Sequence, residues 1–178
     1  MKLPFNLVCI DLETTDTDSK FGSIIQLSAV VLNKSCELIK AREFDTYIQP
    51  LDSYRNHRAM RVNKIPEEIL KTAPTLHEVL LLFESFCDYD NILAAWGSYF
   101  DIPFLKKQYE KIYRKYPFSN RYVDLKSIAI WEMAKKDIPL SSGVNRFLDN
   151  LNSGFEGTPH NALDDIKNTV KILTHFKK

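Results

Sequence analysis

The chain has 178 residues, of which 44% are hydrophobic and 26% are charged, a composition typical of a globular protein with one sizeable core. The formal net charge is only +1, so any basic surface for nucleic acid must be local. No apolar run approaches the roughly 20 residues of a membrane span, and the N-terminus resembles no signal peptide. The three cysteines favour buried reduced thiols and a cytoplasmic protein over disulfides or a zinc site. We expect a single domain over residues 1–178.

The first third of the chain reads as strands. Apolar runs predict strands at 5–12, 24–32 and 37–48, and their short links indicate an antiparallel meander. A short helix is expected at 66–70. Thr75 and Glu78 form a capping box that opens a longer helix with apolar residues at helical spacing.

The rest of the chain alternates between the two kinds of element. The expected elements, in order, are a strand at 91–96, a helix opened by Asp101, a short strand near 121–123, and helices at 124–134, 143–151 and 161–176. This order predicts an α/β fold with a mixed five-stranded sheet flanked by helices.

The most informative segment is Asp11-Leu12-Glu13 at the end of the first strand. Side chains two residues apart lie on the same face of a strand, so both carboxylates should be adjacent. Two buried carboxylates repel each other and lose solvation, and a divalent cation offsets both effects. Mg²⁺ binds through one or two carboxylates plus substrate phosphates, so the pair indicates a metal site that handles phosphate.

Two further segments carry candidate ligands. Asp101 follows an apolar strand and Trp96-Gly97, with N-capping of a helix as the alternative role for its carboxylate. His160 precedes the last helix, whose apolar stripe places Asp165 at its border and Asp164 on the solvated side. The aromatic residues near Asp101 could stack on a base or pack in the core.

In combination, Asp-x-Glu-Thr-Thr, Phe-Asp and His-x₄-Asp resemble the DEDDh branch of 3′-to-5′ exonucleases, which includes RNase T and the proofreading subunit of bacterial DNA polymerase III. The resemblance covers nearly the whole chain and implies a ribonuclease H-like fold. The phrases at 46–50, 73–75 and 96–97 are similar to the histone-mRNA-exonuclease-like group. This resemblance slightly favours RNA over DNA as the substrate.

The resemblance also implies roles for individual residues. Two metal ions, Mg²⁺ or Mn²⁺, would be held by Asp11, Glu13, Asp101 and Asp165, and His160 would be the general base that completes the catalytic set. The positions that match contacts to the terminal nucleotide or lie beside them are Leu12, Thr14, Trp96 and Phe100.

The sequence departs from the family pattern at three places around these motifs. Asp16 stands where many members have glycine, Trp96-Gly97 where they have His-Asn, and Asn63-Lys64-Ile65 where they have His-Gly-Ile. Two basic stretches, at 55–64 and 106–115, either follow a nucleic-acid backbone or form solvated faces.

We therefore expect a metal-dependent exonuclease that hydrolyses single-stranded nucleic acid from the 3′ end to nucleoside 5′-monophosphates. The alternatives are a catalytically idle nucleic-acid-binding domain and an endonuclease of the ribonuclease H type. The expected partners are single-stranded 3′ ends of RNA or DNA, with no membrane. The oligomeric state stays open, and a homodimer is one option.

Overall fold

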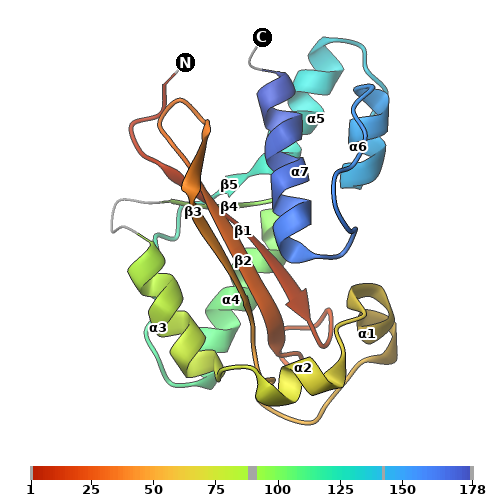
Figure 1. Cartoon of the computed structure of the whole chain (residues 1–178). Coiled ribbons are helices and arrows are strands. Elements are labelled where there is room, and N and C mark those ends of the chain that lie inside the picture. Colours follow the sequence, from red (N-terminus) through yellow and green to blue (C-terminus); the bar gives the residue numbers. More distant parts are fainter. Residues whose placement is uncertain (1, 88–91, 142, 177–178) are drawn as a thin grey trace.

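The computed structural model describes residues 2–87, 92–141 and 143–176. Its centre is a five-stranded sheet in the order β3-β2-β1-β4-β5 (Figure 1). The strands are β1 (Leu7–Thr14), β2 (Ile24–Leu32), β3 (Leu38–Tyr47), β4 (Ile92–Ala95) and β5 (Val123–Asp124). β1, β2 and β3 pair antiparallel, whereas β4 pairs parallel with both β1 and β5. The predicted mixed sheet of five strands is therefore confirmed.

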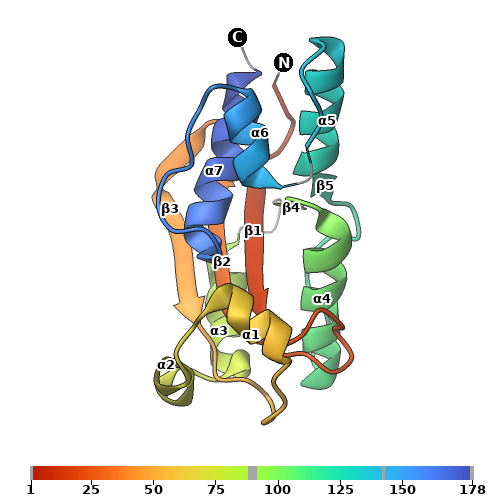
Figure 2. The same cartoon turned by 90° about the vertical axis from the view of Figure 1, so that its right-hand side faces the viewer.

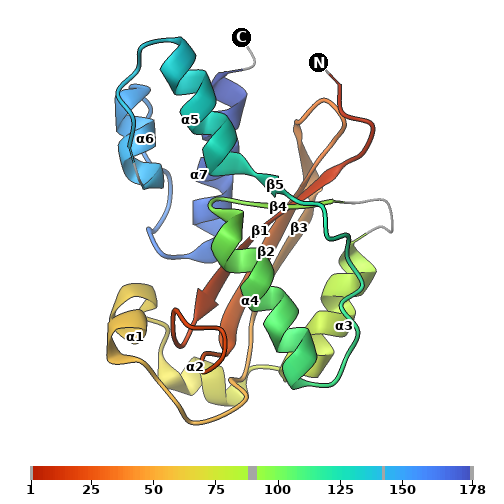
Figure 3. The same cartoon turned by 180° about the vertical axis from the view of Figure 1, so that it is seen from behind.

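Seven helices surround the sheet in the described part of the chain. They are α1 (His57–Asn63), α2 (Glu67–Thr72), α3 (Leu76–Phe86), α4 (Ser98–Lys111), α5 (Leu125–Lys135), α6 (Val144–Asn150) and α7 (Ala162–His175). Figure 3 shows α3 and α4 on one side of the sheet and α5 to α7 on the other. The predicted capping box of α3 is confirmed, because the Thr75 side chain accepts from the Glu78 amide and the Glu78 side chain accepts from the Thr75 amide.

The alternation of side chains along β1 divides its residues between two cores. Val8, Ile10 and Leu12 pack with the cluster that α3 and α4 complete. Leu7 and Cys9 pack with the cluster that includes Ile166 and Val170 of α7. Since alternate residues share a face, the residues that follow Cys9 on the α7 side are Asp11 and Glu13.

Because β4 is short, the end of β1 has no neighbouring strand on that side. β4 pairs with β1 only from Leu7 to Cys9 and ends at Ala95, so β1 continues past it. The turn into α4 fills that position (Figure 2). Side chains from β1, α4 and α7 can therefore meet at the C-terminal end of β1.

The structure corrects one expectation about helices and adds one helix that the sequence patterns did not indicate. α4 begins at Ser98, with Gly97 at its N-cap in the left-handed region at φ +81°, so Asp101 neither opens nor caps the helix. α1 was not predicted, because the segment is basic and buries only Asn63 among its seven residues. Its one local signal is the N-cap residue Asn56, whose side chain accepts from the amides of Arg58 and Ala59.

Two further findings concern β4 and the apolar character of the helices. The predicted strand at 91–96 corresponds to β4, while residue Asn91 lies outside the described residues. Within the described ranges, no helix combines the length and the apolar composition needed to cross a bilayer.

Candidate metal centre

Asp11 and Glu13 lie near the C-terminal end of β1. Their side chains are on the same face of the strand as Leu7 and Cys9, which pack against α7. Both acidic side chains are partly buried, in contrast to the fully buried residues that precede them. This placement follows from the alternation of the strand, as the sequence predicted. The pair therefore lies where the first turn of α7 meets the sheet.

The N-terminal end of α7 places Asp165 and His160 beside this pair. Asn161 caps the helix by accepting from the Asp164 amide, and Asp165 follows in the first turn. His160 is exposed, adopts the left-handed conformation at φ +64°, and donates its backbone N–H to Asp165 Oδ2 at 3.1 Å. Ligand atoms of Glu13, His160 and Asp165 all lie within 4.8 Å of one another, which makes this an acidic group able to hold a metal ion.

Asp101 approaches from the other side of β1. Its side chain is only 4% exposed in the first turn of α4. Backbone hydrogen bonds from Leu12 and from Asp101 itself reach the carboxyl, so it is anchored against β1. Asp124 lies near enough to repel it and is held as the N-cap of α5.

The pKa values show that the carboxylates lie close enough to act on one another. Burial, followed by repulsion from Asp101, Glu13 and Asp165, raises the pKa of Asp11 well above its ordinary range. Burial and the charges of Asp165 and Asp101 raise the pKa of Glu13 to about 8.

The other two carboxyls are also raised. Burial raises the pKa of Asp101 to about 7 and that of Asp165 to about 6, the latter opposed by nearby His160. Four acids in one place disfavour ionisation of one another, and a divalent cation would stabilise their charged forms. The donor set, carboxylate oxygens with one imidazole, fits a hard divalent ion such as Mg²⁺ or Mn²⁺.

A cleft of about 360 Å³ opens over this cluster. Its lining includes Asp11, His160 and Asp165 together with Trp96 and the first turn of α6. Figure 2 shows α6 beside α7. The cleft gives the acidic cluster access to a ligand from solvent.

The four residues predicted to contact a terminal nucleotide differ in exposure. Leu12 and Thr14 are buried, and the Thr14 hydroxyl donates to the Asp16 carbonyl at 2.7 Å. The ring of Trp96 packs edge-to-face on Phe147 at 4.8 Å between centroids, although it also lines the cleft.

Phe100 is partly buried and packs against Phe104 at 5.4 Å between ring centroids. Trp96 and Phe100 therefore contribute to the packing of the molecule as well as to the surroundings of the site. Tyr99, between Trp96 and Asp101, is 75% exposed.

The segment Asn63-Lys64-Ile65, which departs from the family pattern, contacts the C-terminal end of β1. Asn63 donates its side-chain amide to the Thr14 carbonyl at 3.2 Å and accepts from the Ile65 amide at 3.1 Å. Lys64, at the glycine position of the pattern, adopts the left-handed conformation at φ +56°. The position that carries glycine in the pattern thus has, in this chain, a backbone conformation that favours glycine.

Asp16 ties two loops together. It is 6% exposed and accepts hydrogen bonds from the Tyr54 hydroxyl at 2.9 Å, the Asn56 amide at 3.1 Å and the Asp18 backbone at 3.0 Å. These bonds lower its pKa. Asp16 therefore anchors the segment before α1 to the end of β1.

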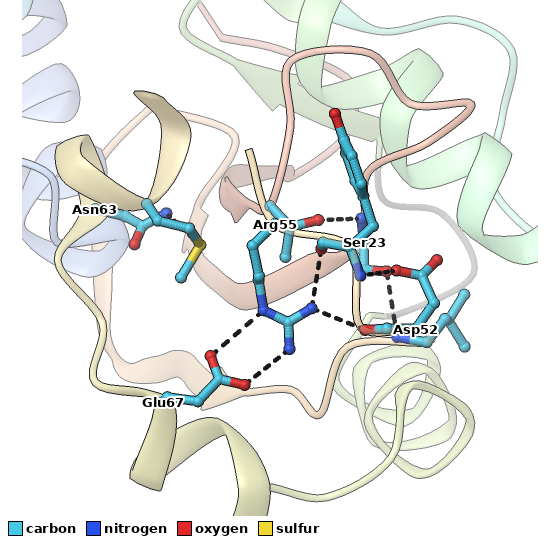
Figure 4. A network of polar contacts seen from close by, with 9 residues as sticks. Ser23, Asp52, Arg55, Asn63 and Glu67 are labelled. Atoms are coloured by element: carbon cyan, nitrogen blue, oxygen red, sulfur yellow. Dashed lines mark hydrogen bonds and ion pairs between the residues drawn. The ribbon is translucent and has the colours of Figure 1, made fainter. Parts of the chain in front are cut away.

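Several cations of the two basic stretches have partners within the protein. Figure 4 shows Arg55 held by both carboxylate oxygens of Glu67, at 3.1 and 3.4 Å, and by the Asp52 carbonyl at 2.8 Å. Arg114 makes two bonds to Glu84, at 2.8 and 2.9 Å. The charges of Arg55 and Arg114 are therefore used in contacts within the fold and are not presented on an open surface for nucleic acid.

Two features of the site differ from what the sequence patterns predict. Asp164 is not solvated: it is partly buried and accepts from the Thr158 backbone at 2.9 Å, so it holds the loop before His160. The first turn of α6, including Arg146, lines the cleft. No sequence signal placed Arg146 there, because its position depends on how α6 packs against Trp96 and α7.

Comparison with known proteins gives a family. The model of the exonuclease family RNase_T matches residues 8–173. The DNA polymerase III PolC-type protein of Clostridium perfringens is 30% identical over 181 residues, covering 96% of this chain and 11% of that protein. The chain thus spans about a tenth of the length of this curated relative.

Solved structures support the same fold. The nuclease domain of 3′hExo, a DEDDh family member bound to rAMP, has a TM-score of 0.80 at 21% identity, covering 99% of this chain and 94% of that one. Exonuclease I of E. coli, in complex with a 5cy-dA13 oligonucleotide, has a TM-score of 0.81 at 15% identity, covering 97% and 40%. These neighbours confirm the predicted ribonuclease H-like fold. The chain therefore belongs to the RNase_T exonuclease family.

Proposed function

We propose that residues 1–178 form a single domain that hydrolyses single-stranded nucleic acid from its 3′ end and releases nucleoside 5′-monophosphates. The observation that carries the proposal is the meeting of four carboxylates and one histidine beneath an open cleft. A domain that only binds nucleic acid gains nothing from buried acids that repel a polyanion. A metal-assisted hydrolase needs them.

Asp11, Glu13, Asp101 and Asp165 are the proposed ligands of two divalent ions, Mg²⁺ or Mn²⁺. The ions, when bound, would neutralise charge that develops on the scissile phosphate. The raised pKa values of these acids mean that protons compete with metal, so loading should improve as the pH rises.

His160 is the proposed general base. It is exposed on the wall of the cleft, and its backbone is fixed by the bond to Asp165. Histidine is the side chain that most often takes a proton from a reacting group in enzymes. Its ring nitrogens also lie close enough to Glu13 and Asp165 to act as a ligand, so the two roles need separate measurement.

Leu12, Thr14, Trp96 and Phe100 are the proposed contacts of the terminal nucleotide. Leu12 and Thr14 lie on either side of Glu13 on β1, and Trp96 lines the cleft above the acids. Phe100 directly precedes Asp101 on α4 and packs against the core cluster that contains Leu12. The partly buried aromatic rings would offer fixed surfaces to a base at little further cost in side-chain entropy.

RNA is slightly favoured over DNA in this proposal. The support is the sequence likeness of segments 46–50, 73–75 and 96–97 to the histone-mRNA-exonuclease-like group. Cytoplasmic location is proposed on the burial of Cys9 and Cys87, which suits reduced thiols. A homodimer is one of the assemblies that sedimentation would test.

The test is a product-length assay with 5′-labelled single-stranded RNA and DNA of one sequence, with Mg²⁺, with Mn²⁺ and with chelator. The variants are Asp11→Asn and its matched control Asp137→Asn, which changes an exposed aspartate beyond the far end of α5. A metal-dependent ladder shortening from the 3′ end, retained in the control and lost in Asp11→Asn, supports the proposal. Cleavage of a circular substrate would indicate an endonuclease, and binding without cleavage would indicate an idle domain.

His160→Ala separates the two roles of the histidine. A general base predicts a rate loss of about 10²- to 10⁴-fold with the affinity for metal retained, measured by calorimetric titration with Mn²⁺. An equal loss of metal affinity would instead make His160 a ligand.

A further inference from the structure

Arg146 is the one lysine or arginine among the described residues that line the cleft. It is exposed in the first turn of α6 and lines the same cleft as Asp11, His160 and Asp165. Within the described residues its side chain forms no hydrogen bond or ion pair, unlike Arg55 and Arg114. A positive charge thus lines the same cleft as the acidic side chains.

The position of Arg146 is set by packing. The next two residues, Phe147 and Leu148, are fully buried, and Phe147 contacts Trp96 edge-to-face. Asn150 donates its side-chain amide to the Pro139 carbonyl at 2.6 Å and to Ser141 Oγ at 2.8 Å, which ties the preceding loop to α6. The backbone that carries Arg146 is therefore fixed relative to the cleft.

We propose that Arg146 binds a phosphate of the substrate strand, at the scissile linkage or its neighbour on the 5′ side. This inference rests on the proposed function, because it takes the cleft as the path of a nucleic-acid strand. The acids cannot themselves attract a phosphodiester, whereas a guanidinium presents paired donors that match two phosphate oxygens. Arg146 thus supplies an attraction for the phosphate that the carboxylates of the cluster cannot supply.

Lys34 provides the matched control. It is exposed in the hairpin after β2, and the pairing of Leu7 with Leu32 places that hairpin at the start of β1, the opposite end from the site. Lys34→Ala removes the same charge as Arg146→Ala without touching the cleft. Arg146→Lys keeps the charge but loses the paired donors.

The first readout is steady-state cleavage of single-stranded RNA by the wild-type protein and the three variants, each checked for an unchanged melting temperature. Arg146→Ala should lower kcat/KM by about 10- to 100-fold, because charge-assisted hydrogen bonds are among the stronger ones. Arg146→Lys should recover part of the loss, and Lys34→Ala should stay within about two-fold of wild type. A neutral methylphosphonate at the second linkage from the 3′ end assigns the phosphate. If Arg146→Ala no longer lowers kcat/KM on this modified substrate, Arg146 binds the phosphate of the second linkage. If Arg146→Ala still lowers kcat on it, Arg146 binds the phosphate of the scissile linkage.

The second readout does not need cleavage. Binding of a labelled oligonucleotide in chelator is measured against salt concentration. For a single strand, loss of one phosphate contact lowers the slope of log K against log salt by about 0.7. Arg146→Ala should show this change and Lys34→Ala should not. A wild-type protein that binds without cleaving would refute the proposed function alone, whereas equal behaviour of Arg146→Ala and Lys34→Ala in both readouts would overturn the role of Arg146.

Discussion

The metal-free protein should lose stability as the pH rises through neutrality, and Glu13 provides the clearest measure. Its pKa is raised from 4.5 to about 8 in the folded protein, so the native state holds a proton that the unfolded chain has already released. Between these two values the native state binds more protons, and the free energy of unfolding therefore falls with rising pH. Below pH 4.5 the effect is absent.

The magnitude follows from the width of that interval. At 1.36 kcal/mol per pKa unit, a rise from 4.5 to about 8 corresponds to a destabilisation on the order of 5 kcal/mol at pH 8. For a domain of this size, 1 kcal/mol changes the melting temperature by about 2–4 °C. The titration of Glu13 should therefore make the melting temperature in chelator roughly 10–20 °C lower at pH 8 than at pH 4.5.

Metal should reverse the loss. An ion that binds only the native state stabilises it by about 2.7 kcal/mol at 100 times its Kd, and deprotonated carboxylates bind it best at high pH. The assay is differential scanning calorimetry from pH 4.5 to 8.5, with chelator and with Mg²⁺ or Mn²⁺. The melting temperature should fall with pH in chelator and recover with metal.

Two variants test the cause. Glu13→Gln removes the charge, along with its repulsion of Asp11, so the fall with pH should shrink and the recovery with metal should weaken. Glu37→Gln is the control, because Glu37 is exposed in the hairpin at the other end of the sheet. A wild-type melting temperature that falls no more than that of Glu13→Gln would refute the electrostatic reasoning.

Three further variants probe the support of the site. Lys64→Gly should raise the free energy of unfolding by about 0.5–1 kcal/mol in urea titrations, because Lys64 holds a left-handed conformation at φ +56°, and a decrease would contradict this. Asp16→Ala should cost about 1–3 kcal/mol near neutral pH by the same titration, since Tyr54 and Asn56 lose their acceptor. The pKa of Asp16 is lowered from its ordinary value, so this cost should shrink as the pH falls through that lowered pKa, and a cost that does not change with pH would refute the assignment. Phe147→Ala should cost about 3–5 kcal/mol by calorimetry and also raise KM, whereas an unchanged KM would show that α6 does not shape the cleft.

The sequence by itself determined the main elements and most of the candidate residues. Local patterns are enough for this, because a strand's alternation puts Asp11 and Glu13 on one face and a helix's period puts Asp165 at the border of its apolar stripe. The capping box of α3 and the nine-residue run of β2 are likewise local, and both appear where expected.

Only the tertiary structure decided how these pieces meet. The early end of β4 leaves room for Asp101 beside Leu12, and that depends on the pairing of two strands far apart in sequence. α1 has no apolar stripe, so its helix is fixed by Asn56, which caps it and donates to Asp16, and by the bond from Asn63 to Thr14. The place of Arg146 in the cleft depends on Phe147 packing against Trp96. Contacts between distant segments set these positions, and a local pattern carries no information about them.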